Sequence, residues 1–556
     1  MLSYRKLAMR VLGRPLHTGG ISSPRPASQR AAAFVLTAAL LTGAAFPAFA
    51  DTYFIEDGDI VISAGTEAGT NKVEQGGTLK SANDMGTIIT NREEGASSNT
   101  VTINAGNDKV EVTLKDVNIE ATGDKAAVSV TGSGNTTIKL DGDNHLTGGI
   151  SDNGSYGLSG ISSSGSLTIY GGENDSLTAK GGSGADGSGG DGIHSGSLTI
   201  YGGTVNANGG NCGDGNYSDG GSGIRISSHS LTIYDGTVNA TGGKSGGGGS
   251  GGNGIDSSGS LTISGSMVNA TGGNGNFSGG DGIRSGGGVT ISGGTVKAAG
   301  GDSKDGYGGD GIRDDGTRSD GGVTISGNTV NAAGGNGGKV GGYGICSFDR
   351  VAISGGTVEA AGGSSGSSNG SDGIYSSVID LSGSLELTAK AGSPNGKALS
   401  QKGSELVLDT IKDKLGPGAK VTATDADGKV IDQVPIPRPV EPEESSSSSD
   451  GGSSAPSAPT SPLPGLTVTD KDGQRISYTS TQSGNTLTVC VGRFTASFRI
   501  SLAALRQLRA EGIETITFQT ILCSTTLSVD ELLAMGGEDA EAVLTHRLTD
   551  SSLTVG

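Results

Sequence analysis

A Gly-Ile pair recurs eight times in the middle of this 556-residue chain, and its spacing limits what the chain can fold into. Successive pairs lie 32, 31, 31, 28, 29, 33 and 29 residues apart. A period of this size is typical of stacked-repeat proteins, in which each repeat buries its apolar side only against the next. The pairs are Gly160-Ile161, Gly192-Ile193, Gly223-Ile224, Gly254-Ile255, Gly282-Ile283, Gly311-Ile312, Gly344-Ile345 and Gly373-Ile374.

Each repeat also holds two apolar triplets, such as Leu198-Thr199-Ile200 and Val205-Asn206-Ala207, with a Gly-Gly corner between them and a Gly-rich loop after them. The triplets alternate apolar and polar residues, which is the period of a strand with one buried face. Glycine at 105 positions excludes helical repeats. We therefore predict an all-β fold, a right-handed parallel β-helix of about 30 residues per coil. Glycine at the corners is expected to supply positive φ.

The two ends of the chain differ from the repeats. Residues 1–50 hold six basic and no acidic residues, then an apolar stretch and Ala48-Phe49-Ala50, which is the pattern of a signal peptide. Residues 51–432 are the predicted parallel β-helix. Residues 433–465 form a Pro/Ser-rich linker, and 466–556 a small α+β domain of unknown function. In that domain Ser501 and Ser528 are expected to cap helices.

These features predict an exported protein, secreted or associated with the cell surface, with no transmembrane segment in the mature chain. The formal net charge of −19 argues against nucleic acid as a partner, because phosphates would be repelled. Cys490 and Cys523 lie on predicted strands of the last domain and are a candidate disulfide. Cys212 and Cys346, about four coils apart, are expected to stay free.

Three tyrosines follow the Leu-Thr-Ile triplet in consecutive coils, at Tyr170, Tyr201 and Tyr234. By alternation the rings point outward and stack along the tube, where they are candidates for contact with sugar rings. The other interpretation is that the stacked rings only stiffen the fold. Asn206, Asn239, Asn269 and Asn331 are expected to form an outward amide ladder.

Acidic and basic residues flank the Gly-Ile pairs at equivalent places. Arg225, Arg284 and Arg313 are glycan-binding candidates, because a guanidinium holds a uronate carboxylate through two hydrogen bonds. Carboxylates in register supply oxygen ligands for calcium. The other interpretation is that the carboxylates accept loop amides and the arginines face solvent. The candidate calcium ligands are Asp191, Asp281, Asp310 and Asp372.

Residues from about Asp51 to Ser400 resemble a secreted bacterial carbohydrate-binding domain family, whose right-handed parallel β-helix is similar to that of pectate lyases. The likeness lies in the run from Val112 to Ile119, the run from Ile138 to Leu146, and the Gly-Ile, Ser-Leu-Thr-Ile and Gly-Gly-Thr-Val-Asn-Ala units that follow. The resemblance implies binding of a plant-type polysaccharide such as cellulose or pectin, with calcium as a candidate cofactor. It does not by itself imply catalysis.

Three functions are compatible with these observations. The prediction is an exported, non-catalytic protein that binds a plant cell-wall or host polysaccharide, with calcium as a candidate aid. A structural or adhesive cell-surface solenoid without a specific glycan is the first alternative. A pectate-lyase-like polysaccharide lyase is the second, in which calcium acidifies a proton and an arginine accepts it. No catalytic residue is predicted.

Overall fold

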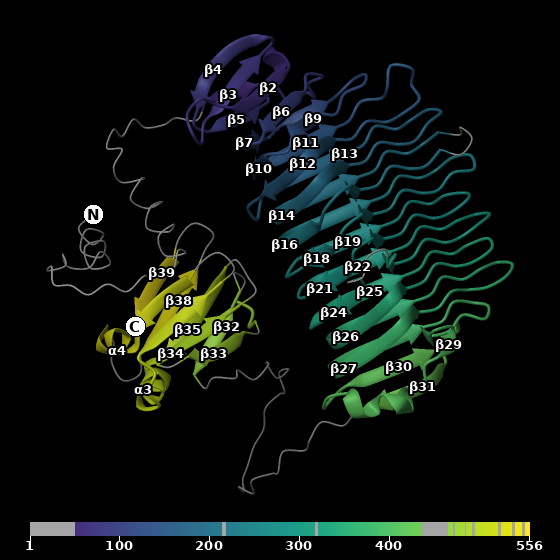
Figure 1. Ribbon diagram of the computed structural model, residues 1–556, viewed down its shortest axis with the longest axis vertical. Coiled ribbons are helices and arrows are strands. Elements are labelled where there is room, and N and C mark those ends of the chain that lie inside the picture. The colour runs from purple at the N-terminus through teal and green to yellow at the C-terminus, as the bar shows by residue number, and fades with distance from the viewer. Residues whose placement is uncertain are drawn as a thin grey trace, which may run out of the picture. The chain divides into compact units, whose positions relative to one another are not determined.

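The computed structural model describes two folded parts, a β-solenoid and a C-terminal domain (Figure 1). The expected signal peptide and nearly all of the expected linker lie outside the described residues. The described residues are 51–213, 218–316, 321–435 and 465–555, the last range without 471–472, 477, 484, 492–494, 521–523, 536–539 and 547–550.

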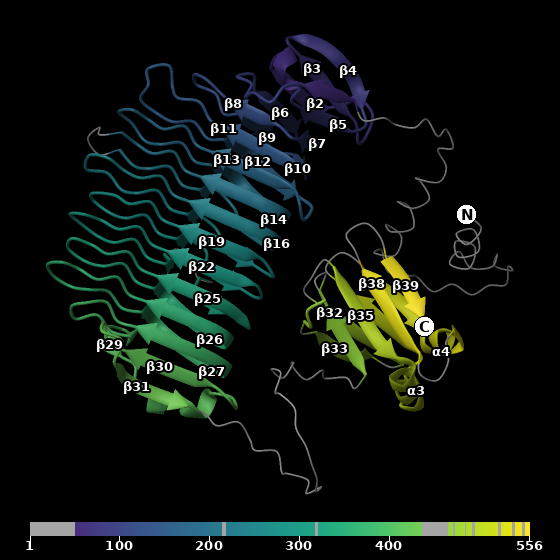
Figure 2. The ribbon, with the colours of Figure 1, turned by 180° about the vertical axis from the view of Figure 1, so that it is seen from behind.

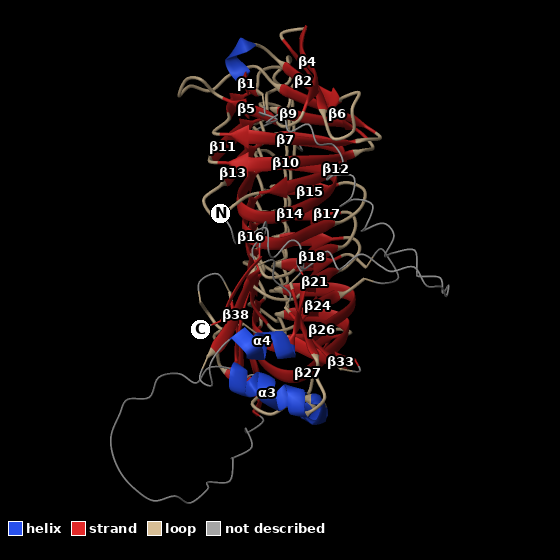
Figure 3. Cartoon of the chain, turned by 90° about the vertical axis from the view of Figure 1, so that its left-hand side faces the viewer, coloured by secondary structure: helices blue, strands red, loops and turns tan. Residues whose placement is uncertain are grey.

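The first part is a right-handed parallel β-solenoid of about 13 turns with about 29 residues per turn, so the predicted fold class is confirmed. Its strands lie across the long axis of the stack (Figure 3). Each coil contributes three strand segments, and equivalent segments of successive coils pair in parallel. Leu198 pairs with Leu231, and Leu231 pairs with Leu261.

The first sheet contains the Gly-Ile segments, the second the Leu-Thr-Ile segments and the third the Val-Asn-Ala segments. Five long strands take part in more than one sheet: β12 (Ile161–Tyr170), β14 (Ile193–Asn208), β16 (Leu231–Thr241), β26 (Ile345–Ala361) and β27 (Ile374–Lys390). The first sheet also has β2 (Ile60–Ala64), β6 (Val101–Gly106), β9 (Val128–Gly132), β15 (Ile224–Ile226), β17 (Ile255–Ser257), β20 (Ile283–Ser285), β23 (Ile312–Asp314) and β28 (Leu399–Gln401). The second has β1 (Thr52–Phe54), β5 (Thr87–Thr90), β7 (Lys109–Lys115), β10 (Asn135–Asp141), β18 (Leu261–Ile263), β21 (Val289–Ile291) and β24 (Val323–Ile325). The third has β8 (Asn118–Glu120), β11 (Asp143–Thr147), β13 (Ser176–Lys180), β19 (Met267–Thr271), β22 (Thr295–Ala299), β25 (Asn328–Ala333) and β30 (Lys420–Thr424).

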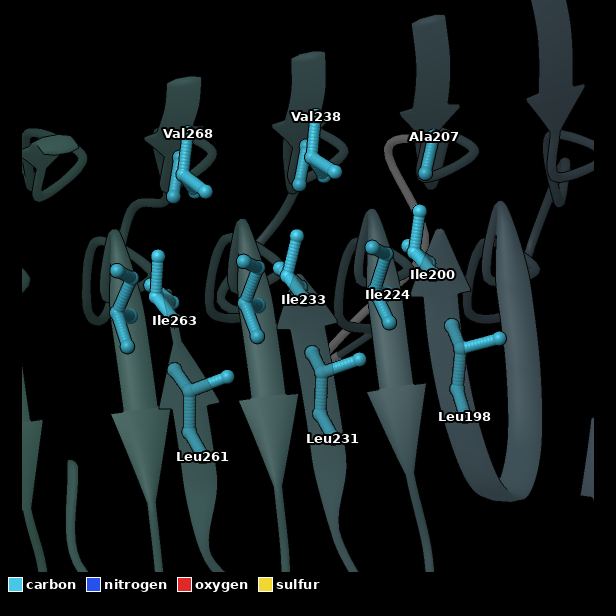
Figure 4. Packing of buried hydrophobic residues seen from close by; sticks show 14 of the residues in the cluster. Leu198, Ile200, Ala207, Ile224, Leu231, Ile233, Val238, Leu261, Ile263 and Val268 are labelled. Carbon is cyan, nitrogen blue, oxygen red and sulfur yellow. The ribbon is translucent and has the colours of Figure 1, made fainter. Parts of the chain in front are cut away.

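The interior of the solenoid consists of rows of identical or similar apolar side chains. Leu198, Leu231 and Leu261 lie in one row along the stack (Figure 4). Ile200, Ile233 and Ile263 form a second row beside it. These side chains are at most 1% exposed, and burial of each stabilises the fold by about 1.5–3 kcal/mol. Because every coil repeats the pattern, one continuous core runs from Tyr53 to Ala423.

Antiparallel strands close both ends of the stack. At the first end β3 (Asn71–Gln75) and β4 (Thr78–Asp84) extend β2, and η1 (Ile55–Asp57) follows β1. At the other end the coil continues beyond the repeat visible in the sequence, because β27 pairs with β30. The elements that complete this end are β29 (Ser404–Glu405), β31 (Val430–Pro435), η2 (Leu408–Thr410) and η3 (Lys412–Lys414).

The Gly-rich loops between the third and first sheets project side by side and form a second ordered region (Figures 1 and 2). Each loop has two legs, and a Gly-Gly pair lies on most of them. The N–H of Gly252 donates to the carbonyl of Gly243 in its own loop, and the N–H of Gly273 donates to the carbonyl of Gly252 in the previous one, at 2.9 and 2.7 Å. We call these paired legs the glycine array. Its chain of hydrogen bonds joins Gly182, Gly190, Gly210, Gly221, Gly243, Gly252, Gly273, Gly280, Gly301, Gly309, Gly335, Gly342, Gly363, Ser371 and Gly392.

Glycine is required in the array because the legs leave no room for a side chain. A Cβ on Gly243 would lie 1.9 Å from the carbonyl oxygen of Gly210, and one on Gly252 would lie 1.9 Å from that of Gly221. The expected role of glycine holds at the corner between the second and third sheets, where Gly202 has a φ of +75°. In the loops the constraint is the close approach of backbones.

The C-terminal domain has two four-stranded sheets and two short helices, which is consistent with the predicted α+β domain. The expected cap is present, since the Ser501 hydroxyl accepts a hydrogen bond from the N–H of Ala504 at 3.2 Å. Phe498 and Phe518 fill the core, with ring centroids 4.9 Å apart. Its elements are β32 (Leu466–Thr469), β33 (Thr479–Ser483), β34 (Thr486–Cys490), β35 (Ala496–Ser501), α3 (Leu502–Ala510), β36 (Thr515–Gln519), β37 (Ser524–Ser528), α4 (Val529–Met535), β38 (Glu541–His546) and β39 (Ser551–Val555).

The cysteine predictions have different outcomes. Cys212 and Cys346 are buried free thiols, as expected. Cys490 is also a free thiol, 3.5 Å from the Gln519 side-chain oxygen. Its expected partner Cys523 lies outside the described residues, so the disulfide stays a prediction. Among the described residues no helix has both the length and the apolar character needed to cross a membrane.

Replacing one glycine of the array tests the packing constraint. Gly243→Ala places a methyl group against the Gly210 carbonyl, so we expect destabilisation of about 1–3 kcal/mol or more, which is typical of overpacking. Gly366→Ala is the matched control, because a Cβ there meets no atom within 4 Å. Thermal unfolding and hydrogen exchange of residues 242–252 measure the effect. Equal behaviour of the two variants would contradict the close packing.

The buried His546 predicts acid sensitivity of the C-terminal domain. Burial lowers the pKa of His546 from 6.5, so the unfolded chain binds a proton more readily than the folded domain does. The stabilising contribution of the neutral ring is therefore present above about pH 6.5 and is lost as the pH falls. The ring lies 2.9 Å from the Thr525 hydroxyl. We expect His546→Gln to keep a polar contact there and to reduce the loss of hydrogen-exchange protection in β38 between neutral pH and about pH 5.

Candidate functional site

The three tyrosines stack along the outer side of the second sheet, as predicted. Tyr170 and Tyr201 have ring centroids 4.7 Å apart at 7°, and Tyr201 and Tyr234 are 4.9 Å apart at 10°. Both faces of Tyr201 are therefore covered by rings, and its burial raises the pKa of the phenol. A sugar ring cannot stack on Tyr201. Tyr170, at the first end of the row, has one face covered by Tyr201, and its other face is turned towards the coil of β10.

A groove of about 740 Å³ lies against this end of the row, on the outer side of β7, β10 and β12. Tyr170 lines it together with the hydroxyls of Thr137, Ser166 and Thr168. In the pairing of β10 with β12, Lys139 stands opposite Tyr170 and Thr137 opposite Thr168. The groove thus combines an aromatic ring with a row of hydrogen-bonding groups held by strand register.

Three charged side chains form the floor of the groove. The Glu111 carboxylate lies 2.6 Å from the Lys139 ammonium and 3.6 Å from the Lys109 ammonium. Burial alone would raise the pKa of Glu111, but the hydrogen bond and charge of Lys139, with Lys109, lower it below the usual range. Glu111 stays ionised and compensates one of the two lysines. No pattern in the sequence indicates these three residues, because they precede the regular repeats and come together only through the register of the coils.

A second hollow of about 600 Å³ continues the groove towards the first end of the solenoid. Lys109 and Glu111 line both. Its far wall is the turn between β2 and β3, which Asn83 fixes by accepting hydrogen bonds from the Thr66 N–H at 2.7 Å and the Glu67 N–H at 3.1 Å. The two hollows therefore form one trough across successive coils.

The predicted arginines lie on the first sheet and do not join the tyrosines of the second. Arg284 and Arg313 both bind Asp315, with nitrogen–oxygen distances of 2.7 and 2.5 Å. Arg225 lies between Asp191 and Asp256, at 3.6 and 3.7 Å. Each guanidinium is thus held by carboxylates of its own chain. Asp315 had no signal in the sequence, because it lies outside the repeated positions.

The four aspartates predicted as calcium ligands act as acceptors between coils. In each case Oδ1 lies 2.7 Å from the backbone nitrogen of the equivalent position in the next coil, and Asn253 does the same. These carboxylates accept hydrogen bonds from backbone amides, as the second interpretation of the sequence predicted. The aspartates and their donors are Asp191 with Ser222, Asp281 with Asp310, Asp310 with Tyr343, and Asp372 with Lys397.

The fit of calcium to these aspartates is poor, since one oxygen of each is used by an amide. The second oxygen of Asp310 lies 3.2 Å from Arg313, where a guanidinium already supplies positive charge. Within the described part of the chain, no group of three or more acidic, His or Cys side chains is placed to hold a metal ion. Calcium binding stays a prediction.

Other outward residues form ladders along the third sheet. The Asn239 side chain donates to Asn206 and that of Asn269 donates to Asn239, both at 2.8 Å, so the amide ladder is confirmed over these coils. In a later coil Asn331 donates to Glu359 at 2.9 Å. These rows consume their hydrogen bonds internally, which favours a structural role.

Comparison with protein-family models, with curated proteins and with solved structures found no match. The fold itself is a parallel β-solenoid, and membership of the carbohydrate-binding family stays a prediction.

Substitution of Asp281 separates its role as an acceptor from its charge. Asp281→Ala leaves the N–H of Asp310 without its partner, and we expect a loss of about 1–3 kcal/mol. Asp281→Asn keeps an oxygen there, as Asn253 does in the previous coil, and should be tolerated. A larger loss for the Asn variant than for the Ala variant, seen in thermal unfolding, would contradict the acceptor role.

The same variants have a predicted pH dependence. Burial raises the pKa of Asp281, and the nearby Asp310 raises it further; burial also raises the pKa of Asp310. The folded chain therefore keeps protons that the unfolded chain releases, and this contribution to stability falls as the pH rises from about 4 towards neutrality. We expect Asp281→Asn to reduce that fall.

Proposed function

We propose that this chain is an exported, non-catalytic polysaccharide-binding protein and that the trough ending at Tyr170 is its binding site. The observation that carries the proposal is that Tyr170, at the end of the row of stacked rings, lines a groove together with hydroxyl-bearing and charged side chains. A sugar ring can pack its C–H face on an aromatic ring while its hydroxyls reach polar neighbours. The bound ligand is a stretch of a longer chain, because the trough continues over several coils.

The charges of the trough bear on the kind of sugar. Two lysines share one carboxylate, so the part near Tyr170 has an excess of one positive charge, whereas Glu67 and Asp108 line the second hollow. An acidic polysaccharide of the pectin type suits this part better than a neutral glucan does. Export is supported by the pattern of residues 1–50.

The two alternatives stand differently. A structural or adhesive solenoid is a second candidate, because the glycine array extends the coils between Gly182 and Gly392 with backbone that is hydrogen-bonded from one coil to the next. A lyase would need an arginine able to accept a proton, and the three arginine candidates lie beside carboxylates. The lyase is not part of the proposal.

Retention of the purified chain on cellulose, polygalacturonate and host glycans, with and without a chelator, tests the proposal. We expect Tyr170→Ser to weaken retention about tenfold, or about 1.4 kcal/mol, because the ring that lines the groove is lost. Tyr234→Ser is the matched control, since it removes the ring at the other end of the same row. Serine follows the same triplet in the next coil, at Ser264, so both variants should fold.

The same assay reads the charge preference. Glu111→Gln releases both lysines and should strengthen retention on polygalacturonate, whereas Lys139→Met should weaken it, and neither should change retention on cellulose. Absence of retention on every support would favour the structural alternative. Loss of retention with the chelator would support calcium as an aid.

A further inference from the structure

Two aromatic side chains are exposed at the tips of two neighbouring loops, beyond the paired legs that form the glycine array. Phe277 is 58% exposed and Tyr307 is 49% exposed. Their ring centroids lie 6.4 Å apart at an angle of 69°, so the two rings meet edge to face. Only 4% of the chain is aromatic, so two exposed aromatic neighbours on adjacent glycine-rich loops are an unusual feature of this surface.

The backbone under this aromatic pair is fixed by its neighbours. The N–H of Tyr307 donates to the carbonyl of Phe277 at 3.2 Å. The Ser303 hydroxyl donates to the Asn276 carbonyl and accepts from the N–H of Gly306, both at 3.0 Å. A contact made by a pre-ordered tip loses little conformational entropy.

The size of the pair indicates what it can bind. Phe and Tyr bury about 150–250 Å² each when fully covered, so the half-exposed pair offers about 200 Å². A stable protein interface needs about 800 Å² on each partner. A single sugar ring matches the smaller area, and the exposed Lys304 and Asp305 beside the pair supply hydrogen-bonding groups for its hydroxyls.

We infer that Phe277 and Tyr307 form a second glycan contact, separate from the trough. This inference rests on the proposed function, because it assigns a further site for the same class of ligand. The loops project to the right in Figure 1, away from β7 and β10 on the left, so one short oligosaccharide does not reach both sites. A protein with both contacts can hold two polysaccharide chains at once.

The test measures retention on polygalacturonate and cellulose for four proteins: the unchanged full chain, Tyr170→Ser, the double variant Phe277→Ser with Tyr307→Ser, and all three changes together. We expect the double variant to weaken retention several-fold in either background. The single variant Tyr307→Ser should show part of the effect and should fold, because Ser278 and Val340 occupy the paired positions of adjacent coils. Phe348→Ser is the control, since Phe348 is 50% exposed but lies on β26 of the solenoid.

The outcomes separate the two proposals. The tip contact is overturned if the unchanged chain is retained and the double change has no effect on retention, either in the unchanged chain or in the Tyr170→Ser variant. The trough proposal is not affected by that result. If the unchanged chain is retained on no support, the proposed function itself fails. An equal effect of Phe348→Ser would also overturn the inference, because it would show that any exposed aromatic residue contributes.

Discussion

The solenoid depends on successive coils approaching to hydrogen-bonding distance, both in the three sheets and in the glycine legs of the loops. In the three sheets this approach is ordinary strand pairing, and the side chains alternate inward and outward. In the glycine array there are no alternating side chains. Each leg is approached by neighbouring legs so closely that a carbonyl oxygen lies about where a Cβ would be, for example 1.9 Å from a Cβ placed on Gly243. The array therefore adds hydrogen bonds without adding an apolar core, and at every position of its chain except Ser371 the residue is glycine, which lacks a Cβ.

The same approach determines what polar side chains can do. Asp191, Asp281, Asp310 and Asp372 are fixed between coils as acceptors of backbone amides. Arg225 balances the buried charge of Asp191, and Arg313 balances that of Asp310. Such carboxylates resemble a row of metal ligands when only the sequence is read, yet one oxygen of each already has a donor. The trough is different, because Glu111 and the two lysines meet on an open surface, where a ligand can compete for them.

Much of the fold could be predicted from the sequence, because a strict repeat converts spacing into position. The coil length, the three strands and the stacked tyrosines all follow from the Gly-Ile period and the alternation within triplets. The exposure of ring faces did not follow, since alternation places Tyr201 outside but does not show that its neighbours cover it. Asp315, Lys109 and Glu111 were missed for another reason: they lie outside the regular units and meet their partners only through coil register. The glycine array was read as loops, because glycine carries no pattern that distinguishes a turn from close packing.

The array has a consequence for the cleavage of the loops by proteases. A protease acts on a segment that it can pull out into its own cleft, and projecting loops are the usual points of attack. Here each leg is bonded to legs before and after it, so a cut at one tip frees two ends that stay in place. We infer that a chain cut at one loop tip keeps its fold, and that the projecting loops of the solenoid resist unfolding after cleavage.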